Sequence, residues 1–341
     1  MAHRTTIQDL AKAAGVSVSS IDRILNGRDK VRASTAAKVL AAAEELQFYA
    51  LPLLRDRLQA DRPRMRVGVL LQQSHRPFYR SIAEMLRSVA AESPDHVEVL
   101  IEHMDDLSPE AVAERMLALG RQVGALAVVS AQHARIAHAI EILAGEGVPT
   151  YGLISELSAS CDVGYVGLDN WRVGRTAAWT VTGLCRKLGP VAILIGNHRY
   201  RCQELNEVGF RSYFREHAPE FTLLEPVQTF EDKTIARDVT EQLLTREPGL
   251  VGIYVAGGGL SGVLDAIRES GRARQVITVS NDITEHTRLG LFDNTLSMAF
   301  AHPLPQLANE LIALMARDIR NPSAGRTKRV LRFDVVTPEN V

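Results

Sequence analysis

From Arg66 onward, short apolar runs rich in β-branched residues alternate with longer stretches of helical periodicity. The candidate strands are 66–71, 97–101, 124–129, 149–153, 162–167, 190–195, 222–228, 250–255, 276–280 and 295–299, and 330–336 adds one more. Their hydrophobicity is continuous rather than alternating, which is typical of parallel strands covered by helices on both faces. Because so many strands exceed the usual content of about five or six for one sheet, the pattern predicts two α/β sheets.

The residues before about position 48 carry a different pattern. Apolar residues recur there at spacings of three and four, which predicts three short helices, and the residues suited to N-cap them are Thr6, Ser17 and Ser34. Gly15 lies between the first two helices, where it permits the left-handed backbone of a tight turn. We therefore expect a three-helix domain with a helix-turn-helix.

The second of these helices, over 17–25, is the one expected to enter the major groove of DNA. Val18 and Ser19 point outward near its N-terminus, and Arg23 lies further along the same face. An Arg guanidinium can read guanine or hold a phosphate.

Net charge is distributed unevenly along the chain. The first 64 residues hold 11 Lys and Arg against 7 Asp and Glu, a net charge of +4. The other 277 residues hold 28 against 33, a net charge of −5. A small basic module on a mildly acidic body suggests a polyanion as the partner of the module.

Between the two patterns, Pro52 and Pro63 flank a two-turn helix, which fits a linker better than a core element. The sequence therefore predicts a helix-turn-helix domain at 1–48, a hinge or linker at 49–64 and a body at 65–341.

Several classes of protein are excluded by what the sequence lacks. The N-terminus MAHRTTIQDL has no apolar stretch typical of a secretory signal, and no run of about 18 apolar residues suggests a membrane span, so we expect a cytoplasmic protein. The three cysteines match neither a disulfide framework nor a CxxC pair; they are Cys161, Cys185 and Cys202. No HExxH or G-x-S-x-G motif is present, so we expect no metal, no cofactor and no enzymatic activity.

The N-terminal residues resemble the DNA-binding signature of the lactose/galactose repressor (LacI/GalR) family. The motif runs Thr6-Ile7-x-Asp9-Leu10-Ala11-x-x-Ala14-Gly15-Val16-Ser17 and then Arg23-Ile24-Leu25-Asn26-Gly27. The resemblance implies that Val18, Ser19 and Arg23 contact bases. It also implies that the residues that cap helices or touch phosphates are Thr6, Ser17 and Asn26.

Two positions depart from this pattern. Asp22 stands where the family usually has Ser; it would orient Arg23 or Arg28, or accept a hydrogen bond from a cytosine amino group. The linker reads Phe48-Tyr49-Ala50-Leu51-Pro52, where the family has a Tyr-x-Pro-Asn sequence before a hinge helix. The candidates for the side chain that this helix wedges into the minor groove are Leu54 and Leu58, and the alternative for both is packing against the core domain.

The body resembles the periplasmic sugar-binding-protein fold of the same family, in which a small molecule binds between two lobes. At the carboxyl ends of the strands, the groups suited to a sugar or polyol are Gln72, Gln73, Phe78, Tyr79, Asp105, Asp169 with Asn170 and Trp171, Asn206, Asp282 and His302. By family pattern, Asp169 falls in an inter-lobe ligand loop and Asp282 on a late sugar-binding strand. Asn206 replaces the usual clamping Arg, and Gly257-Gly258 replaces the usual Asn-Asp pair.

A competing signal lies at 253–262, where a strand runs into G-x-G-x-x-G and then a helix. This is the dinucleotide-binding pattern, in which backbone amides approach a pyrophosphate. At face value it indicates an NAD-dependent oxidoreductase that uses Gly257–Gly262. Such a turn normally opens a complete nucleotide-binding domain, and only about 80 residues follow it here; the same glycines serve equally as a slim wall of a cleft.

Together these features predict a sequence-specific transcriptional regulator, expected to be a repressor. Its partners are expected to be double-stranded operator DNA, a small carbohydrate-like effector and a second copy of the chain, because one helix-turn-helix reads only a half-site.

Overall fold

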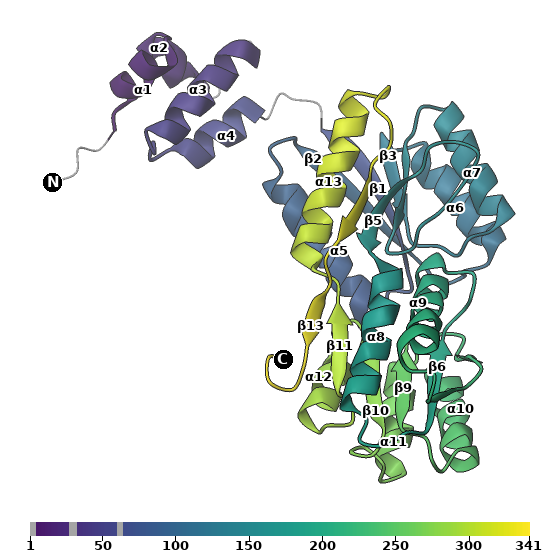
Figure 1. Ribbon diagram of the computed structural model, residues 1–341. Coiled ribbons are helices and arrows are strands. Elements are labelled where there is room, and N and C mark those ends of the chain that lie inside the picture. The colour runs from purple at the N-terminus through teal and green to yellow at the C-terminus, as the bar shows by residue number, and fades with distance from the viewer. Residues whose placement is uncertain (1–4, 27–32, 60–63) are drawn as a thin grey trace. The chain divides into compact units, whose positions relative to one another are not determined.

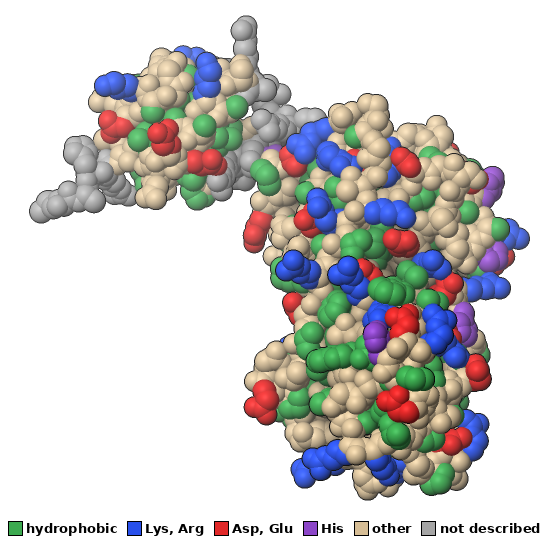
Figure 2. Space-filling view, viewed as in Figure 1, with side chains coloured by type: hydrophobic (Ala, Val, Ile, Leu, Met, Phe, Trp, Pro, Cys, Tyr) green, Lys and Arg blue, Asp and Glu red, His purple; other side chains and the backbone are tan. Residues whose placement is uncertain are grey.

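The computed structural model describes residues 5–26, 33–59 and 64–341, so Gly27, Arg28 and Pro63 lie outside the described residues. The chain divides into two compact units, one built mainly on the residues up to Arg64 and the other, the body, on Met65–Ser93 and Val97–Val341 (Figure 1, Figure 2). No helix of the described part is long and apolar enough to cross a membrane.

The N-terminal unit contains four helices: α1 (Ile7–Ala14), α2 (Val18–Leu25), α3 (Ala33–Glu45) and α4 (Leu51–Gln59). The expected caps are present on the first two, because the Thr6 and Ser17 side chains accept hydrogen bonds from the backbone of the N3 residues. Gly15 takes the left-handed conformation at the turn, with φ of 65°. The prediction for Ser34 is wrong, because α3 begins one residue earlier and Ser34 lies inside its first turn.

Helix α4 packs on the core of this unit. Leu54 is fully buried in one cluster with Leu10, Ile21 and Val39, and Leu58 is partly buried against the same cluster. The segment predicted as a linker therefore contributes a packed helix, and Leu54 belongs to the core of the N-terminal unit.

A Leu54→Ala substitution should destabilise the N-terminal unit by about 2–5 kcal/mol, because it removes a buried side chain and leaves a cavity. The measurement is amide hydrogen exchange of α1 and α2 in the full chain, which should accelerate. Leu53→Ala is the matched control, since Leu53 is 44% exposed. Equal exchange in the two variants would show that α4 does not stabilise the unit.

Lobe 1 of the body is a six-stranded parallel sheet in the order β12-β5-β4-β3-β1-β2. Its strands are β1 (Met65–Gln72), β2 (Val97–Met104), β3 (Ala125–Val128), β4 (Thr150–Leu153), β5 (Gly164–Leu168) and β12 (Lys328–Leu331). Its helices are α5 (Pro77–Glu92), α6 (Pro109–Gly120), α7 (Ala134–Gly145) and α13 (Leu304–Arg320). Val69 faces the cluster that includes α5 and α13, whereas Leu70 faces the cluster that includes α6 and α7.

Lobe 2 is a second, mostly parallel sheet in the order β13-β11-β10-β9-β6-β7, with β8 also on β6. Its strands are β6 (Pro190–Ile195), β7 (Thr222–Leu223), β8 (Val227–Gln228), β9 (Gly252–Val255), β10 (Ile277–Asn281), β11 (Met298–Ala301) and β13 (Asp334–Val336). Its helices are α8 (Asn170–Leu184), α9 (Arg201–His217), α10 (Lys233–Arg246), α11 (Leu260–Glu269) and α12 (Glu285–Phe292). The prediction of two α/β sheets is therefore confirmed.

Three details differ from the predicted strands. The run 222–228 forms two short strands, because Pro226 has no N–H to donate between them. The run 330–336 also forms two strands, one in each lobe, and β13 is antiparallel to β11. The strand expected at 295–299 begins only at Met298, because the turn before it extends to Thr295, whose N–H binds the Asp293 carboxylate.

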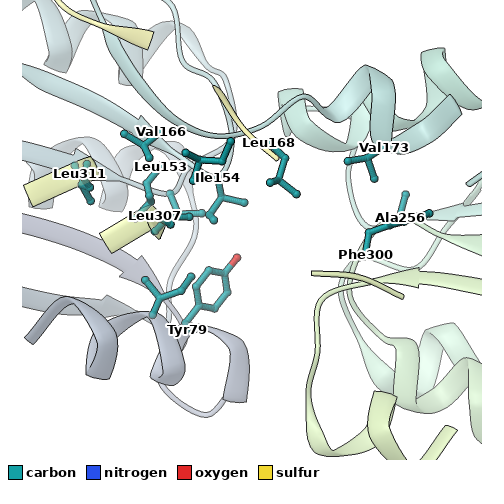
Figure 3. Close-up of a cluster of buried hydrophobic side chains, with 14 of the residues drawn as sticks. Tyr79, Leu153, Ile154, Val166, Leu168, Val173, Ala256, Phe300, Leu307 and Leu311 are labelled. Atoms are coloured by element: carbon teal, nitrogen blue, oxygen red, sulfur yellow. The ribbon is translucent and has the colours of Figure 1, made fainter. Parts of the chain in front are cut away.

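The chain passes between the lobes three times: after β5, between β11 and α13, and between β12 and β13. An apolar cluster continues across this junction. Figure 3 shows Tyr79, Leu307 and Leu311 of lobe 1 on one side of the junction and Val173 and Phe300 of lobe 2 on the other. The body is consequently two-lobed, with the carboxyl ends of several strands of both sheets meeting at the junction.

Candidate functional site

A cleft of about 670 Å³ lies between the lobes. This volume is in the range that holds small molecules. Most of the predicted effector contacts line it, namely Gln72, Gln73, Phe78, Tyr79, Asn170, Asn206, Asp282 and His302. They come from the ends of β1 and β10 and from α5, α8, α9 and the link between β11 and α13.

Asp282 and His302 form a pair at the wall of this cleft. His302 Nδ1 lies 2.6 Å from Asp282 Oδ1, and the His302 ring lies 5.5 Å from that of Phe78. Asp282 has a left-handed backbone with φ of 63°, a conformation that Asp tolerates better than most residues. Since a carboxylate accepts, Nδ1 donates to it. The buried Nε2 atom of this cleft-lining residue has no hydrogen-bond partner among the described residues.

Two further buried polar atoms of the lining lack a protein partner. They are Gln73 Oε1 and Asn206 Oδ1. Buried polar atoms are normally satisfied, so this set calls for hydrogen-bonding groups on a ligand or on water. Asn206 is only 2% exposed and sits where α9 crosses α8 closely: a Cβ on Gly174 would lie 2.0 Å from the Asn206 carbonyl oxygen.

Aromatic hydroxyls complete the polar lining. Burial raises the pKa of Tyr200 to about 12, and burial also raises the pKa of Tyr79 well above its usual value. Both hydroxyls therefore stay protonated at neutral pH and can donate. Gln72 Nε2 donates to Tyr200 Oη over 2.7 Å, which joins lobe 1 to lobe 2 across the cleft.

Sequence reasoning missed the ion pair in the cleft. Arg76 of lobe 1 and Glu231 of lobe 2 lie 2.8 Å apart, and Gln203 Nε2 donates to the same carboxylate. Arg76 had a usable signal, since it precedes α5 in the loop after β1 that supplied Gln73. Glu231 had a signal of the same kind, since it follows the predicted strand 222–228 by three residues.

Three predicted contacts, Asp105, Asp169 and Trp171, are not in the cleft. Asp105 is exposed beyond β2. Asp169 caps α8 by accepting from Arg172 N and pairs with the Arg172 side chain over 3.2 Å. It lies in a separate depression of about 900 Å³ with Trp171, over α8 and β12. The reason is local: the chain turns into α8 here, so the buried Asn170, not Asp169, faces the cleft.

The cysteines are free thiols. Cys202 lines the cleft, where burial raises its pKa to about 12, and burial raises the pKa of Cys185 to about 11. Because the thiolate is the reactive form, both are poor nucleophiles at neutral pH. Within the described residues, no group of three or more His, Cys, Asp or Glu side chains could hold a metal ion.

Helix α2 presents the predicted DNA contacts to solvent. Val18 is 46% exposed. The other predicted contacts of the motif are exposed too: Ser17, Ser19, Arg23 and Asn26 on or at the ends of α2, and Thr6 at the start of α1. Asn26 Nδ2 donates to the Asp22 carboxylate over 3.1 Å and to the Asp22 carbonyl over 2.9 Å. Asp22 therefore pairs with Asn26, the C-cap residue of α2, which is not among the partners that the sequence suggested for it.

Family models match both units. Residues 67–321 match the periplasmic binding protein domain. The chain belongs to the periplasmic binding protein domain family. Residues 6–50 match the lacI family of bacterial regulatory proteins, so this family member carries a lacI-type helix-turn-helix ahead of its two lobes. The resemblance drawn from the N-terminal motif is confirmed.

Curated relatives are named as regulators. The chain is 26% identical over 329 residues to the HTH-type transcriptional regulator DegA of Bacillus subtilis, covering 96% of this chain and 92% of that one. It is 28% identical over 169 residues to the HTH-type transcriptional regulator MalR of Streptomyces coelicolor, covering 49% of this chain and 47% of that one. These relatives give no support to the oxidoreductase alternative.

Solved structures share the two-lobed fold. A periplasmic solute binding protein from Actinobacillus succinogenes with bound D-allose aligns with a TM-score of 0.72 at 20% identity, covering 81% of this chain and 99% of that one. The glucose-galactose binding protein GanP of Geobacillus stearothermophilus gives 0.74 at 14% identity, covering 82% and 99%. The expected fold class is confirmed.

Proposed function

We propose that this chain is a sequence-specific DNA-binding transcriptional regulator whose affinity for its operator is set by a small effector in the inter-lobe cleft. The observation that carries the proposal is the combination, in one chain, of a lacI-type helix-turn-helix with a cleft holding unpartnered buried polar atoms. The named relatives DegA and MalR are regulators, which supports a role in transcription. We infer repression rather than activation from the repressor family, and action in the cytoplasm, where the DNA lies.

The proposed DNA contacts follow the exposed face of α2. Val18, Ser19 and Arg23 read base edges, and the phosphates are contacted by Thr6, Ser17 and Asn26. Leu58 is the better of the two candidates for a minor-groove wedge, because it is only partly buried whereas Leu54 is 0% exposed. A wedge role for Leu54 requires α4 to leave the core.

The proposed effector is an uncharged polyhydroxyl molecule. Gln73 Oε1 and Asn206 Oδ1 accept hydrogen bonds. With Nδ1 donating to Asp282, His302 Nε2 accepts in the neutral imidazole and donates in the imidazolium. Sugar hydroxyls can donate to such atoms, and the Phe78 and Tyr79 rings offer apolar surface for a pyranose face. D-allose and other monosaccharides occupy the related solute-binding proteins, which favours the same class here.

The proposed mechanism is a shift in populations. An effector that touches both lobes stabilises one lobe arrangement, and this changes the fraction of molecules competent for DNA. A homodimer is part of the proposal, since two helix-turn-helix units are needed to read a near-palindromic operator. No catalysis is proposed.

Two measurements test this function. The full chain is mixed with fragments of the source genome and excess bulk DNA, and the retained fragments are sequenced; the expected result is enrichment of a few near-palindromic sites. A thermal-shift screen with monosaccharides and polyols should find a stabilising ligand, because binding to the folded state raises the melting temperature. Absence of any preferred fragment, with and without every sugar of the panel, would exclude the function.

A further inference from the structure

The glycine-rich turn that resembles a dinucleotide site contacts a carboxylate of the chain itself, the side chain of Glu231. The Gly258 N–H donates to Glu231 Oε2 over 2.8 Å. Arg76 Nη1 donates to the same oxygen over 2.8 Å, and Gln203 Nε2 donates to Oε1 over 2.6 Å. The Glu231 side chain is only 13% exposed, so this carboxylate is enclosed by one charged and two neutral donors.

The glycines leave space for this carboxylate. A Cβ on Gly196 would lie 1.8 Å from Glu231 Oε1, and a Cβ on Gly258 would lie 2.1 Å from Oε2. On Gly257 it would lie 3.0 Å from Oε1. Real Cβ atoms essentially never lie closer than 3.0 Å to such atoms, so a side chain at Gly196 or Gly258 would displace the carboxylate. The three glycines therefore form a cradle that accommodates a planar anion next to the start of α11.

The loop that delivers Glu231 is conformationally unusual. Phe230 and Glu231 are successive non-glycine residues with left-handed backbones, at φ of 51° and 62°. Such conformations persist where surrounding contacts over-determine them. Arg76 supplies two of these contacts: Nη1 donates to the Glu231 carboxylate, and Nη2 donates to the Glu231 backbone carbonyl oxygen over 3.1 Å.

We propose that Arg76, Gln203 and the Gly257–Gly258 turn form an anion-binding site that Glu231 occupies as an internal ligand. Glu231 is then a specificity-determining residue: while its carboxylate fills the site, phosphate and carboxylate groups are excluded from this part of the cleft. The anion-binding site itself does not depend on the regulatory function. If the proposed function holds, the regulator responds to uncharged sugars and not to their phosphate esters, and this consequence rests on that function.

The test uses the full chain and inorganic phosphate as the probe. Glu231→Gly removes the internal carboxylate and suits the left-handed backbone, so the emptied site should bind phosphate. Melting temperatures are measured against phosphate concentration, with ionic strength held constant by sodium chloride. We expect the variant to bind phosphate with a dissociation constant of about 1 mM, at least about tenfold tighter than the unchanged chain.

Matched variants isolate the cause. Phe230→Gly makes the same backbone change one residue earlier and should leave the phosphate response unchanged. Arg76→Gln combined with Glu231→Gly should abolish the new phosphate binding. Glu231→Ala opens the same space without adding glycine flexibility and replaces Glu231→Gly if that variant does not fold.

These outcomes test the anion-binding site and not the regulatory function, because neither DNA nor a sugar is present in the experiment. Equal phosphate responses in the unchanged chain and in Glu231→Gly would overturn the proposal, as would binding that survives loss of Arg76. Either result with operator binding intact would leave the regulatory function standing.

Discussion

Replacing Arg23 with Ala is expected to remove operator selectivity while the folded body still binds its effector. Arg23 lies on the exposed face of α2, and the N-terminal motif predicts that it contacts bases. A bidentate Arg–guanine contact is worth about 1–3 kcal/mol of discrimination, so operator affinity should fall about tenfold to hundredfold. Affinity for random DNA should fall much less. Competition footprinting on the selected operator against bulk DNA measures both.

Lys12→Ala is the matched control for charge. Lys12 is exposed in the last turn of α1 and likewise loses one positive charge. A cation that contacts only phosphate weakens specific and random binding alike and lowers the salt dependence. If Arg23→Ala behaves in this same way, with selectivity retained, then Arg23 holds a phosphate and base reading lies with other residues.

The cleft was predictable because strand ends were predictable. Continuous apolar runs locate buried parallel strands, and polar residues just after them fall at the sheet edge where the lobes meet. Gln73 and Asp282 were found in this way. Asp169 follows β5 by the same rule, yet the chain leaves lobe 1 there to begin α8, and the N-cap geometry turns its carboxylate away from the cleft. The position of Asp169 after a predicted strand does not reveal in which direction its side chain points.

Glu231 and the packing of α4 on the N-terminal core were missed for a different reason. Glu231 is held by partners from the loop between β1 and α5, from α9 and from the turn after β9, segments that are far apart in the sequence. The glycine-rich turn was considered as a pyrophosphate site or as a slim wall of a cleft, and nothing in the sequence pointed to a carboxylate of the chain itself at this turn. Likewise, Leu54 between two prolines has no pattern of its own; its burial depends on a surface that α1, α2 and α3 create together.

Asp282→Asn should weaken effector binding about tenfold to hundredfold while operator binding without effector remains normal. The substitution keeps the side-chain shape, and Asn tolerates the left-handed backbone at this position, with φ of 63°. It removes the charge that orients His302 Nδ1–H, and hydrogen bonds to charged groups contribute about 1.5–3 kcal/mol. Calorimetric titration with the sugar identified by the thermal-shift screen gives the change in affinity.

Asp169→Asn is the control for this change, because it makes the same carboxylate-to-amide replacement outside the cleft. Asn caps helices about as well as Asp, so α8 should remain stable and effector binding should not change. Both aspartates follow a parallel strand, but only Asp282 lines the cleft. The two variants therefore distinguish an effect of position in the cleft from an effect of losing any carboxylate. Weaker binding in Asp169→Asn with normal binding in Asp282→Asn would mean that the effector occupies the depression over α8, and the inter-lobe cleft would lose its assigned role.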